Sequence, residues 1–301
     1  MAYGFIGLGH LGGKLAASLL RAGFDLVVCD LDAKAAEPLV AAGAHFAATP
    51  AEVAARCEAV ITCLPSPVAS KRALEGPGGI LAGARAGLVW IEMSTNDRDS
   101  IRALADIAAQ KGVATLECPV TGGVHLAASG EITVIVGGDA DLFERCRPAL
   151  AAMGRRLFHV GPIGSASVIK VITNMLAFIH LVAAGEALML AKRGGLDLAQ
   201  AFEVIRASSG NSFVHETESQ LILNGSYNIN FTMDLACKDL GFALGFGREF
   251  GVPLDLAALT EQTFLRARSA YGGAEWSTAV VKLLEDALKT DLRAPGFPAE
   301  L

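Results

Sequence analysis

The first half of the chain alternates short apolar runs with Ala-rich amphipathic segments. Apolar runs bounded by turn residues predict buried strands, and the segments of helical period between them predict covering helices. The predicted strands are Tyr3–Gly7, Phe24–Asp30, Ala59–Leu64, Leu88–Glu92, Ala114–Glu117, Ile132–Gly137 and, closing the sheet, Leu157–Val160. The first two helices are expected at Gly12–Ala22 and Glu37–Ala42. This alternation is typical of a parallel sheet covered by helices on both faces.

The second half of the chain has a helical period almost throughout, after a turn at residues 161–164. A long helix is predicted at Ser165–Arg193. The shorter helices are predicted at Leu198–Ala207, His215–Asn224, Met233–Phe250, Leu254–Ala270 and Thr278–Lys289. We therefore expect an α/β domain over residues 1–163 and an all-α domain over residues 164–292. Residues 293–301, which contain two Pro, are expected to form a loose tail.

The composition argues against several classes of protein. Hydrophobic residues make up 52% of the 301 residues and charged residues 19%, so the chain can bury a sizeable core. The net charge of −6 and the lack of a basic stripe argue against nucleic-acid binding. The six Cys include no CxxC pair, which argues against a disulfide scaffold and against a bound metal. A reducing, cytoplasmic location is therefore expected.

The stretch Val171–Leu190 is apolar enough to be considered as a membrane span. It contains Asn174, His180 and Glu186, which are unfavourable in lipid. We therefore expect a long helix buried in protein, and no membrane association.

A glycine motif, Gly7-Leu8-Gly9-His10-Leu11-Gly12, lies between the first predicted strand and the first predicted helix. The first Gly permits a tight turn, the second lets a phosphate approach the backbone, and the third lets helix and strand pack closely. The start of the helix then offers free N–H groups to a pyrophosphate. This context predicts a Rossmann-type dinucleotide site, which does not need a basic patch.

Asp30 ends the second predicted strand, 18 residues after Gly12. A carboxylate at this position can accept hydrogen bonds from the ribose hydroxyls of the adenosine, and it repels a 2′-phosphate. The next two residues are Leu31 and Asp32, so no Arg follows to pair with that phosphate. The motif therefore favours NAD as the cofactor over NADP.

Four further segments, together with the glycine motif, resemble the β-hydroxyacid dehydrogenase family. They are Glu117–Gly123, Gly161–Lys170, Lys170–Asn174 and Lys238–Ala243. That family includes 3-hydroxyisobutyrate dehydrogenase, tartronate semialdehyde reductase and, more distantly, the much longer 6-phosphogluconate dehydrogenase. The resemblance implies a Rossmann domain followed by a helical domain, with the active site between them. It also implies homodimers or homotetramers that form through the helical part.

The resemblance also implies roles for individual residues. Lys170 matches the catalytic lysine of the family, and Asn174 matches its active-site asparagine. The substrate-binding loop matches Thr121, Gly122 and Gly123, where Thr121 replaces the usual Ser. Phe213 falls at a substrate-binding position that varies with the substrate. The remaining matches are residues that line the cofactor, namely Leu64, Pro65, Ser94, Thr95 and Lys238.

Lys170 and Asn174 are four residues apart in the predicted long helix, so their side chains share one face. Oxidation of a hydroxyl group needs a base for the hydroxyl proton while hydride leaves for the nicotinamide, and the reverse reaction needs an acid there. We hypothesise that Lys170 is this acid/base. Asn174 would orient the substrate hydroxyl or the lysine.

The implied function is an NAD(P)-dependent oxidoreductase (EC 1.1.1.-) that acts on a β-hydroxyacid or its semialdehyde. Candidate substrates are 3-hydroxyisobutyrate and the glycerate/tartronate semialdehyde pair. Two alternatives stay open. One is an imine reductase-like enzyme, whose members usually lack the lysine at Lys170, and the other is a non-catalytic dinucleotide-binding scaffold.

Overall fold

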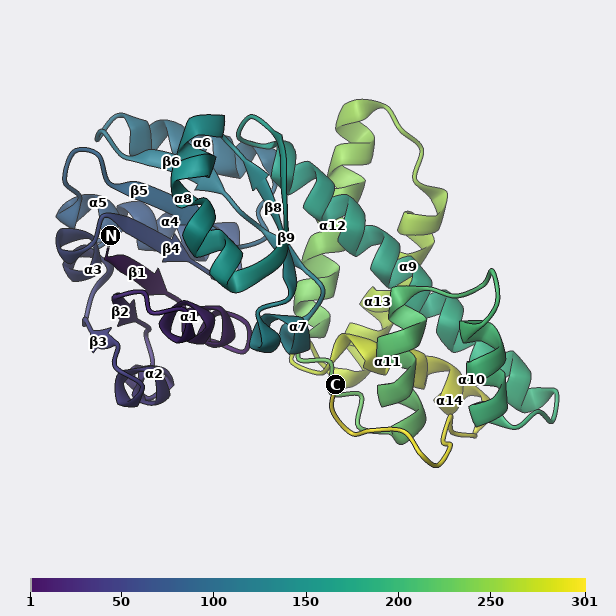
Figure 1. Ribbon diagram of the computed structural model, residues 1–301. Helices are drawn as coiled ribbons and strands as arrows, with labels where there is room; N and C mark the ends of the chain where they lie inside the picture. Colours follow the sequence, from purple (N-terminus) through teal and green to yellow (C-terminus); the bar gives the residue numbers. More distant parts are fainter. Residues whose placement is uncertain (1) are drawn as a thin grey trace. The chain divides into compact units, whose positions relative to one another are not determined.

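The computed structural model describes residues 2–301 and divides into two compact units (Figure 1). The first ends at Lys170 and is called the sheet unit below. The second, the helical unit, comprises Val171–Leu301. The long helix α9 (Ser165–Arg193) begins in the sheet unit and continues into the helical unit. The two units divide within this helix, after Lys170. The domain boundary expected after residue 163 stays a prediction.

The sheet unit contains a nine-stranded sheet in the order β3-β2-β1-β4-β5-β6-β8-β7, with β9 paired to β8 at the edge. The strands are β1 (Tyr3–Ile6), β2 (Leu26–Cys29), β3 (His45–Phe46), β4 (Ala59–Thr62), β5 (Val89–Glu92), β6 (Ala114–Glu117), β7 (Val120–Thr121), β8 (Ile132–Gly137) and β9 (Gly154–Gly161). All seven predicted strands are therefore present. The two-residue strands β3 and β7 were not predicted, because so short a segment has no detectable period.

The sheet is mainly parallel, as predicted, and β8 is the exception. This strand runs antiparallel to β6 and β7, while β1 to β6 and the pair β8–β9 are parallel. The physical reason lies in the connection. The segment between β6 and β8 contains β7 and the short helix α7 (Val124–Ser129). Because β7 pairs antiparallel with β8, this segment turns the chain back beside β6 and makes no crossover.

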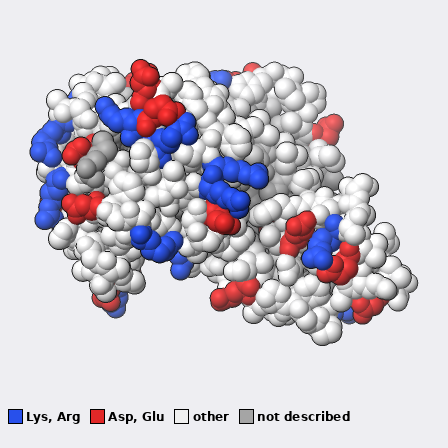
Figure 2. Space-filling view, viewed as in Figure 1, with Lys and Arg blue, Asp and Glu red and all other residues white. Residues whose placement is uncertain are grey.

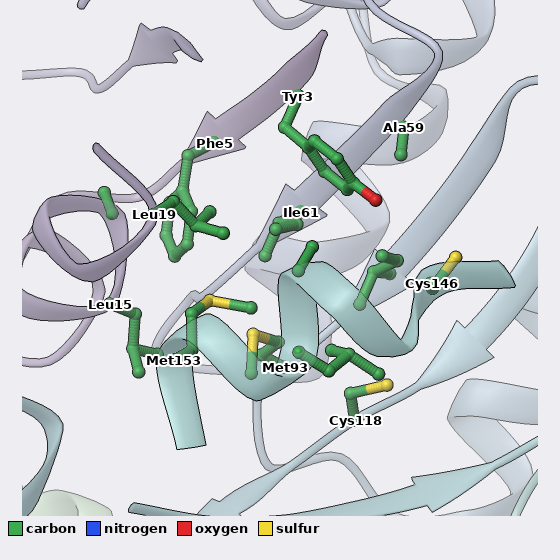
Figure 3. Packing of buried hydrophobic residues seen from close by; sticks show 14 of the residues in the cluster. Tyr3, Phe5, Leu15, Leu19, Ala59, Ile61, Met93, Cys118, Cys146 and Met153 are labelled. Atoms are coloured by element: carbon green, nitrogen blue, oxygen red, sulfur yellow. The ribbon is translucent and has the colours of Figure 1, made fainter. Parts of the chain in front are cut away.

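Helices cover both faces of the sheet, as predicted. They are α1 (Gly12–Arg21), the 3-10 helix η1 (Ala33–Ala36), α2 (Glu37–Ala41), α3 (Pro50–Arg56), α4 (Pro67–Glu75), α5 (Ile80–Gly83), α6 (Arg98–Ala109), α7 and α8 (Ala140–Met153). Helices α1 and α8 pack on the face that carries Tyr3, Phe5 and Ile61 (Figure 3). Helices α3 to α6 pack on the opposite face, around Val60 and Trp90. This arrangement confirms the Rossmann-type α/β class of the first domain.

The helical unit is all-α, as predicted. After α9 it contains α10 (Leu198–Arg206), α11 (Phe213–Asn224), α12 (Met233–Phe250), α13 (Asp255–Tyr271), the 3-10 helix η2 (Ser277–Val281) and α14 (Lys282–Leu288). Its core forms where α9 meets its neighbours. The Phe178 ring lies 5.3 Å from that of Phe264 and 5.9 Å from that of Phe231. These aromatic contacts hold α9 at the centre of the unit.

The last nine residues are not a loose tail, contrary to expectation. Arg293 donates hydrogen bonds to Glu285 Oε1 (3.0 Å) and Tyr227 Oη (2.8 Å). The Phe297 ring packs edge-on against Phe202 at 5.0 Å, and its carbonyl accepts a hydrogen bond from Asn224. One cation and one aromatic ring therefore attach the C-terminal segment to the helical core, and two Pro do not prevent it.

Within the described residues, α9 is one helix that is long and apolar enough to cross a membrane, judged by length and composition alone. Only 39% of its most apolar window is buried in the single chain.

Acidic and basic side chains are interspersed on the face that Figure 2 shows, and no continuous basic stripe is visible on that face.

Candidate active site

The glycine motif forms the turn between β1 and α1 at the carboxyl edge of the sheet. Gly7 has φ of 94°, and a Cβ there would lie 2.4 Å from the Cys63 carbonyl oxygen. A Cβ on Gly12 would lie 2.0 Å from the Gly7 carbonyl oxygen. A Cβ on Gly9 would have no atom within 4 Å. Two glycines are therefore required by packing, and the middle one leaves space in front of the backbone.

Helix α1 begins without a side-chain cap. Its N-cap residue, Leu11, makes no side-chain hydrogen bond, whereas Thr49, Ser66 and Asp97 cap α3, α4 and α6. An uncapped helix start next to open space can bind an anion through its backbone N–H groups. The helix start and the space at Gly9 together fit a pyrophosphate.

Asp30 follows the last residue of β2 and contacts the glycine turn. Its Oδ2 accepts a hydrogen bond from Leu8 N (2.6 Å), and its Oδ1 accepts one from Asp32 N (2.9 Å). Each carboxylate oxygen can accept a further hydrogen bond. Asp30 therefore orients the turn and keeps acceptor capacity for ribose hydroxyls.

The loops after β4 and β5 meet at the same edge of the sheet. Leu64 N donates to Ser94 Oγ at 2.8 Å, and Ser94 is buried. Pro65 is exposed and Thr95 is partly exposed. In the order 3-2-1-4-5-6, a dinucleotide that crosses β1 with its adenosine over β2 has its other half over β4 and β5. The predicted residues of these loops are therefore on the expected side of the glycine turn.

Glu117, the last residue of β6, caps the start of α9. The side chain is 1% exposed. Its Oε1 accepts hydrogen bonds from the N–H groups of Gly164 (2.6 Å) and Ala166 (2.8 Å). Its Oε2 accepts from Ser167 N (3.2 Å) and Ser167 Oγ (2.7 Å). Burial raises the pKa of Glu117, and the hydrogen bonds from Ser167, Ala166 and Gly164 oppose that rise.

Lys170 lies five residues after the first residue of α9, which is about 8 Å along the helix axis. It is buried, with 7% of its surface exposed. Because Glu117 attaches the first turn of α9 to the end of β6, Lys170 is held near the carboxyl edge of the sheet. Within the sheet unit, the structure therefore brings together the glycine turn, the two loops and a buried lysine.

Asn174 lies one turn after Lys170, in the helical unit, where it joins a buried group on α12. Its Nδ2 donates to Asp239 Oδ2 at 2.6 Å, and Lys238 Nζ lies 2.7 Å from Asp239 Oδ1. Asp239 is 1% exposed. An exposed ion pair, which is the ordinary interpretation of Lys-Asp in a sequence, is therefore excluded. Lys238 Nζ also lies 4.9 Å from the centre of the Phe242 ring.

The predicted substrate loop connects β7 to α7. Gly122 and Gly123 have φ of 126° and 88°, so both adopt a backbone that favours glycine. The His125 ring lies against Gly123, and burial lowers its pKa. Burial therefore favours the neutral form of the His125 ring. Phe213 is the first residue of α11 and is exposed.

Sequence reasoning missed Glu117, Glu92 and Asp239 as parts of the site. The structure buries all three acids, and Glu92 and Glu117 are flanked by apolar residues in the sequence. An acid at the end of a predicted buried strand, as at Glu92 and Glu117, could have been detected as unusual.

Among residues 2–301, His, Cys, Asp and Glu form no group that could hold a metal ion.

The chain is similar to known proteins over nearly its whole length. Residues 2–161 match the NAD binding domain of 6-phosphogluconate dehydrogenase. Residues 164–284 match the NAD-binding family of NADP-dependent 3-hydroxyisobutyrate dehydrogenase.

Two curated relatives and one solved structure illustrate the similarity. The 2-(hydroxymethyl)glutarate dehydrogenase of Eubacterium barkeri is 35% identical over 283 residues, which are 94% of each chain. The L-threonate dehydrogenase of Cupriavidus necator is 36% identical over 281 residues, which are 93% of this chain and 95% of the relative. A crystal structure of 3-hydroxyisobutyrate dehydrogenase from Salmonella typhimurium is 30% identical with a TM-score of 0.88, covering 94% of this chain and 99% of that one.

The open space at Gly9 gives a test of the dinucleotide site. The substitution Gly9→Ala should leave the melting temperature unchanged, because the new methyl group meets no atom within 4 Å. It should raise the Kd for NADH at least about tenfold, because the methyl group occupies the path of the phosphate. The measurements are thermal unfolding and a fluorescence titration with NADH.

The matched control is Gly245→Ala in α12, where a Cβ also meets nothing within 4 Å. It should leave NADH binding unchanged. Unchanged binding by Gly9→Ala would place the dinucleotide elsewhere.

Proposed function

Because the chain belongs to the β-hydroxyacid dehydrogenase family, we propose that it transfers a hydride between a nicotinamide cofactor and the hydroxyl or carbonyl group of a small β-hydroxyacid, with Lys170 as acid/base. The observation that carries the proposal is the burial of Lys170 on a helix that Glu117 attaches to the carboxyl edge of the sheet. Burial of an amine is unfavourable for stability, so a buried lysine at this place is a candidate for a functional role.

The residues at the carboxyl edge fit a dinucleotide. The start of α1 and the space at Gly9 would hold the pyrophosphate, Asp30 the ribose of the adenosine, and the loops at Leu64 and Ser94 the nicotinamide half. When bound, the cofactor supplies the hydride acceptor or donor, and the protein supplies position and proton transfer.

Lys170 has the proton role in this proposal. As an amine it takes the proton of the substrate hydroxyl during oxidation, and as an ammonium it returns that proton during reduction. Asn174 has one amide hydrogen engaged by Asp239, which fixes the orientation of its amide plane. In the proposed role, the amide group oriented in this way positions the substrate hydroxyl or the lysine. Lys238 donates a hydrogen bond to the same carboxylate, which places its ammonium group beside Asn174 as the proposed contact for cofactor oxygens.

The substrate is proposed to bind by its carboxylate at Thr121, Gly122 and Gly123. Backbone N–H groups in consecutive glycines with positive φ, together with the Thr121 hydroxyl, suit an anion. The two relatives act on 2-(hydroxymethyl)glutarate and L-threonate, which extends the candidates beyond 3-hydroxyisobutyrate and glycerate. Phe213 remains the proposed contact for the variable end of the substrate.

We also propose a homodimer or homotetramer in the cytoplasm. Ile169, Ile172 and Leu176 are exposed at spacings of three and four residues, so they form one apolar stripe on α9. A second copy that covers this stripe would explain why so apolar a helix is little buried in one chain. A monomeric mass in light scattering would contradict this proposal.

Replacement of the lysine tests the chemistry. Lys170→Ala should lower kcat by about 10²–10⁴, the usual contribution of a general acid/base, while the Kd for NADH stays unchanged. The measurement is turnover with NAD or NADP on a panel of 3-hydroxyisobutyrate, glycerate, L-serine and L-threonate. Lys192→Ala is the control, since Lys192 lies on the same helix and pairs with Asp291.

Full turnover by Lys170→Ala would remove the lysine from the mechanism. A wild-type protein that binds NADH but oxidises no member of a broad panel would favour the scaffold alternative.

Asp30 and Asp32 support NAD as the cofactor, because both repel a 2′-phosphate at the end of β2. The wild-type kcat/KM should therefore be higher with NAD than with NADP. Leu31 is 98% exposed, so Leu31→Arg adds a guanidinium beside the ribose without loss of packing. This variant should raise kcat/KM for NADP about tenfold, the effect of about one charge-assisted hydrogen bond.

Leu31→Ala serves as the control, since it shortens the same side chain without adding charge. A wild-type preference for NADP would show that the assignment from Asp30 is wrong.

A further inference from the structure

Ser94 connects three segments at the carboxyl edge of the sheet. Its Oγ accepts the hydrogen bond from Leu64 N at 2.8 Å, which attaches the loop after β4. The hydroxyl of Ser70, on α4, lies 3.4 Å from the same oxygen. The Ser94 carbonyl lies 3.5 Å from Asn96 Nδ2, within its own loop. The position of the Ser94 side chain therefore fixes how the loops after β4 and β5 lie relative to each other.

Glu92 holds Ser94 in that position. It is the last residue of β5, and its Oε1 accepts a hydrogen bond from Ser94 N at 2.7 Å. The side chain is 1% exposed. On the neighbouring strand, Thr62 is directly opposite Glu92 in the sheet register and accepts a hydrogen bond from the Trp90 indole at 2.8 Å. The carboxyl group therefore lies in a closed, rigid part of the sheet.

The second oxygen of Glu92 is unusual. Among residues 2–301, Oε2 is buried and has no hydrogen-bond partner. Burial raises the pKa of Glu92, and the Ser94 N–H group and nearby hydroxyl groups oppose that rise. A buried acid with an unpartnered oxygen is unfavourable for stability, and such local conflicts are expected at functional sites. Glu92 therefore needs an explanation other than stability.

We propose that Glu92 is a positioning residue for the nicotinamide half of the cofactor, because it fixes Ser94 and, through Ser94, joins the loops after β4 and β5. This inference rests on the proposed function, since the side of the sheet that takes the nicotinamide follows from the dinucleotide site. Glu92 is buried and acts through Ser94.

Two ligands separate this role from a purely structural one. NADH contains both halves of the cofactor, whereas ADP-ribose lacks the nicotinamide. An apolar side chain at position 92 removes the acceptor of the Ser94 N–H group, so the loops lose their common arrangement. Glu92→Met should raise the Kd for NADH about tenfold and leave the Kd for ADP-ribose unchanged. Glu92→Gln should bind both ligands like wild type. The amide oxygen of Gln can still accept the hydrogen bond from Ser94 N, although the acid is replaced by a neutral group.

Ser94→Ala tests the next link, and it applies also if Glu92→Met does not fold. It keeps the Ser94 N–H group that donates to Glu92, but it removes the Oγ that accepts from Leu64 N. It should again weaken NADH binding and spare ADP-ribose. The control is Thr115→Val on β6, outside both loops. It removes a hydroxyl oxygen that is buried and, among residues 2–301, has no hydrogen-bond partner. It should change the Kd of neither ligand.

Equal NADH affinity for wild type and a folded Glu92→Met would overturn the inference, and so would a parallel loss of NADH and ADP-ribose binding. Loss of NADH binding in Glu92→Gln equal to that in Glu92→Met would also contradict it, because the hydrogen-bond acceptor is retained there. If wild type binds neither ligand, the proposed function fails instead, and the two failures are therefore distinct.

Discussion

The carboxylate of Glu117 at the start of α9 is the interaction on which the geometry of the site depends. Three N–H groups and one hydroxyl group converge on this single side chain. A helix start is favourable for a negative charge and leaves N–H groups without partners inside the helix. Glu117 satisfies both needs from the end of a central strand. The strand thereby determines where α9 begins, and the helix determines where Lys170 lies.

Other acids at the same edge of the sheet also accept hydrogen bonds from backbone N–H groups. In the register of β4, β5 and β6, Thr62, Glu92 and Glu117 are consecutive neighbours. Glu117 accepts hydrogen bonds from the start of α9, and Glu92 accepts one from the loop after β5. Asp30, on the other side of β1, accepts one from the glycine turn. Each carboxylate fixes backbone N–H groups at a place where a ligand is expected. Burial of Glu92 and Glu117 is unfavourable, but it yields loops that are already ordered before the cofactor binds.

Much of this architecture could be predicted from the sequence, because it depends on local patterns. The strand Ala114–Glu117 and the helices Ser165–Arg193 and Met233–Phe250 have strong periods, and the structure has the same bounds. The antiparallel direction of β8 and the attachment of the C-terminal segment through Arg293 depend on contacts between distant residues. No period in the sequence encodes such contacts.

The candidate site divides in the same way. The glycine turn could be predicted because three glycines at fixed spacing serve one local geometry. Lys170 and Asn174 could be paired because four residues make one helical turn. Asp239 could not be assigned to Asn174, since the two are 65 residues apart and only the fold brings them within 2.6 Å. Glu92, Glu117 and Asp239 therefore emerge only from the structure, whereas Asp30 and the residues proposed for the chemistry could be predicted from the sequence.

The central claim is that Glu117 positions Lys170 for chemistry, and the kcat of a folded Glu117→Gln variant tests it most directly. Gln presents an N–H₂ group to N–H donors, so the helix start must shift. The account predicts that kcat falls at least about tenfold while NADH binding is unchanged. Asp139→Asn, the matched acid-to-amide change at the start of α8, should leave kcat unaltered. Unchanged turnover in Glu117→Gln, despite lower stability, would contradict the account.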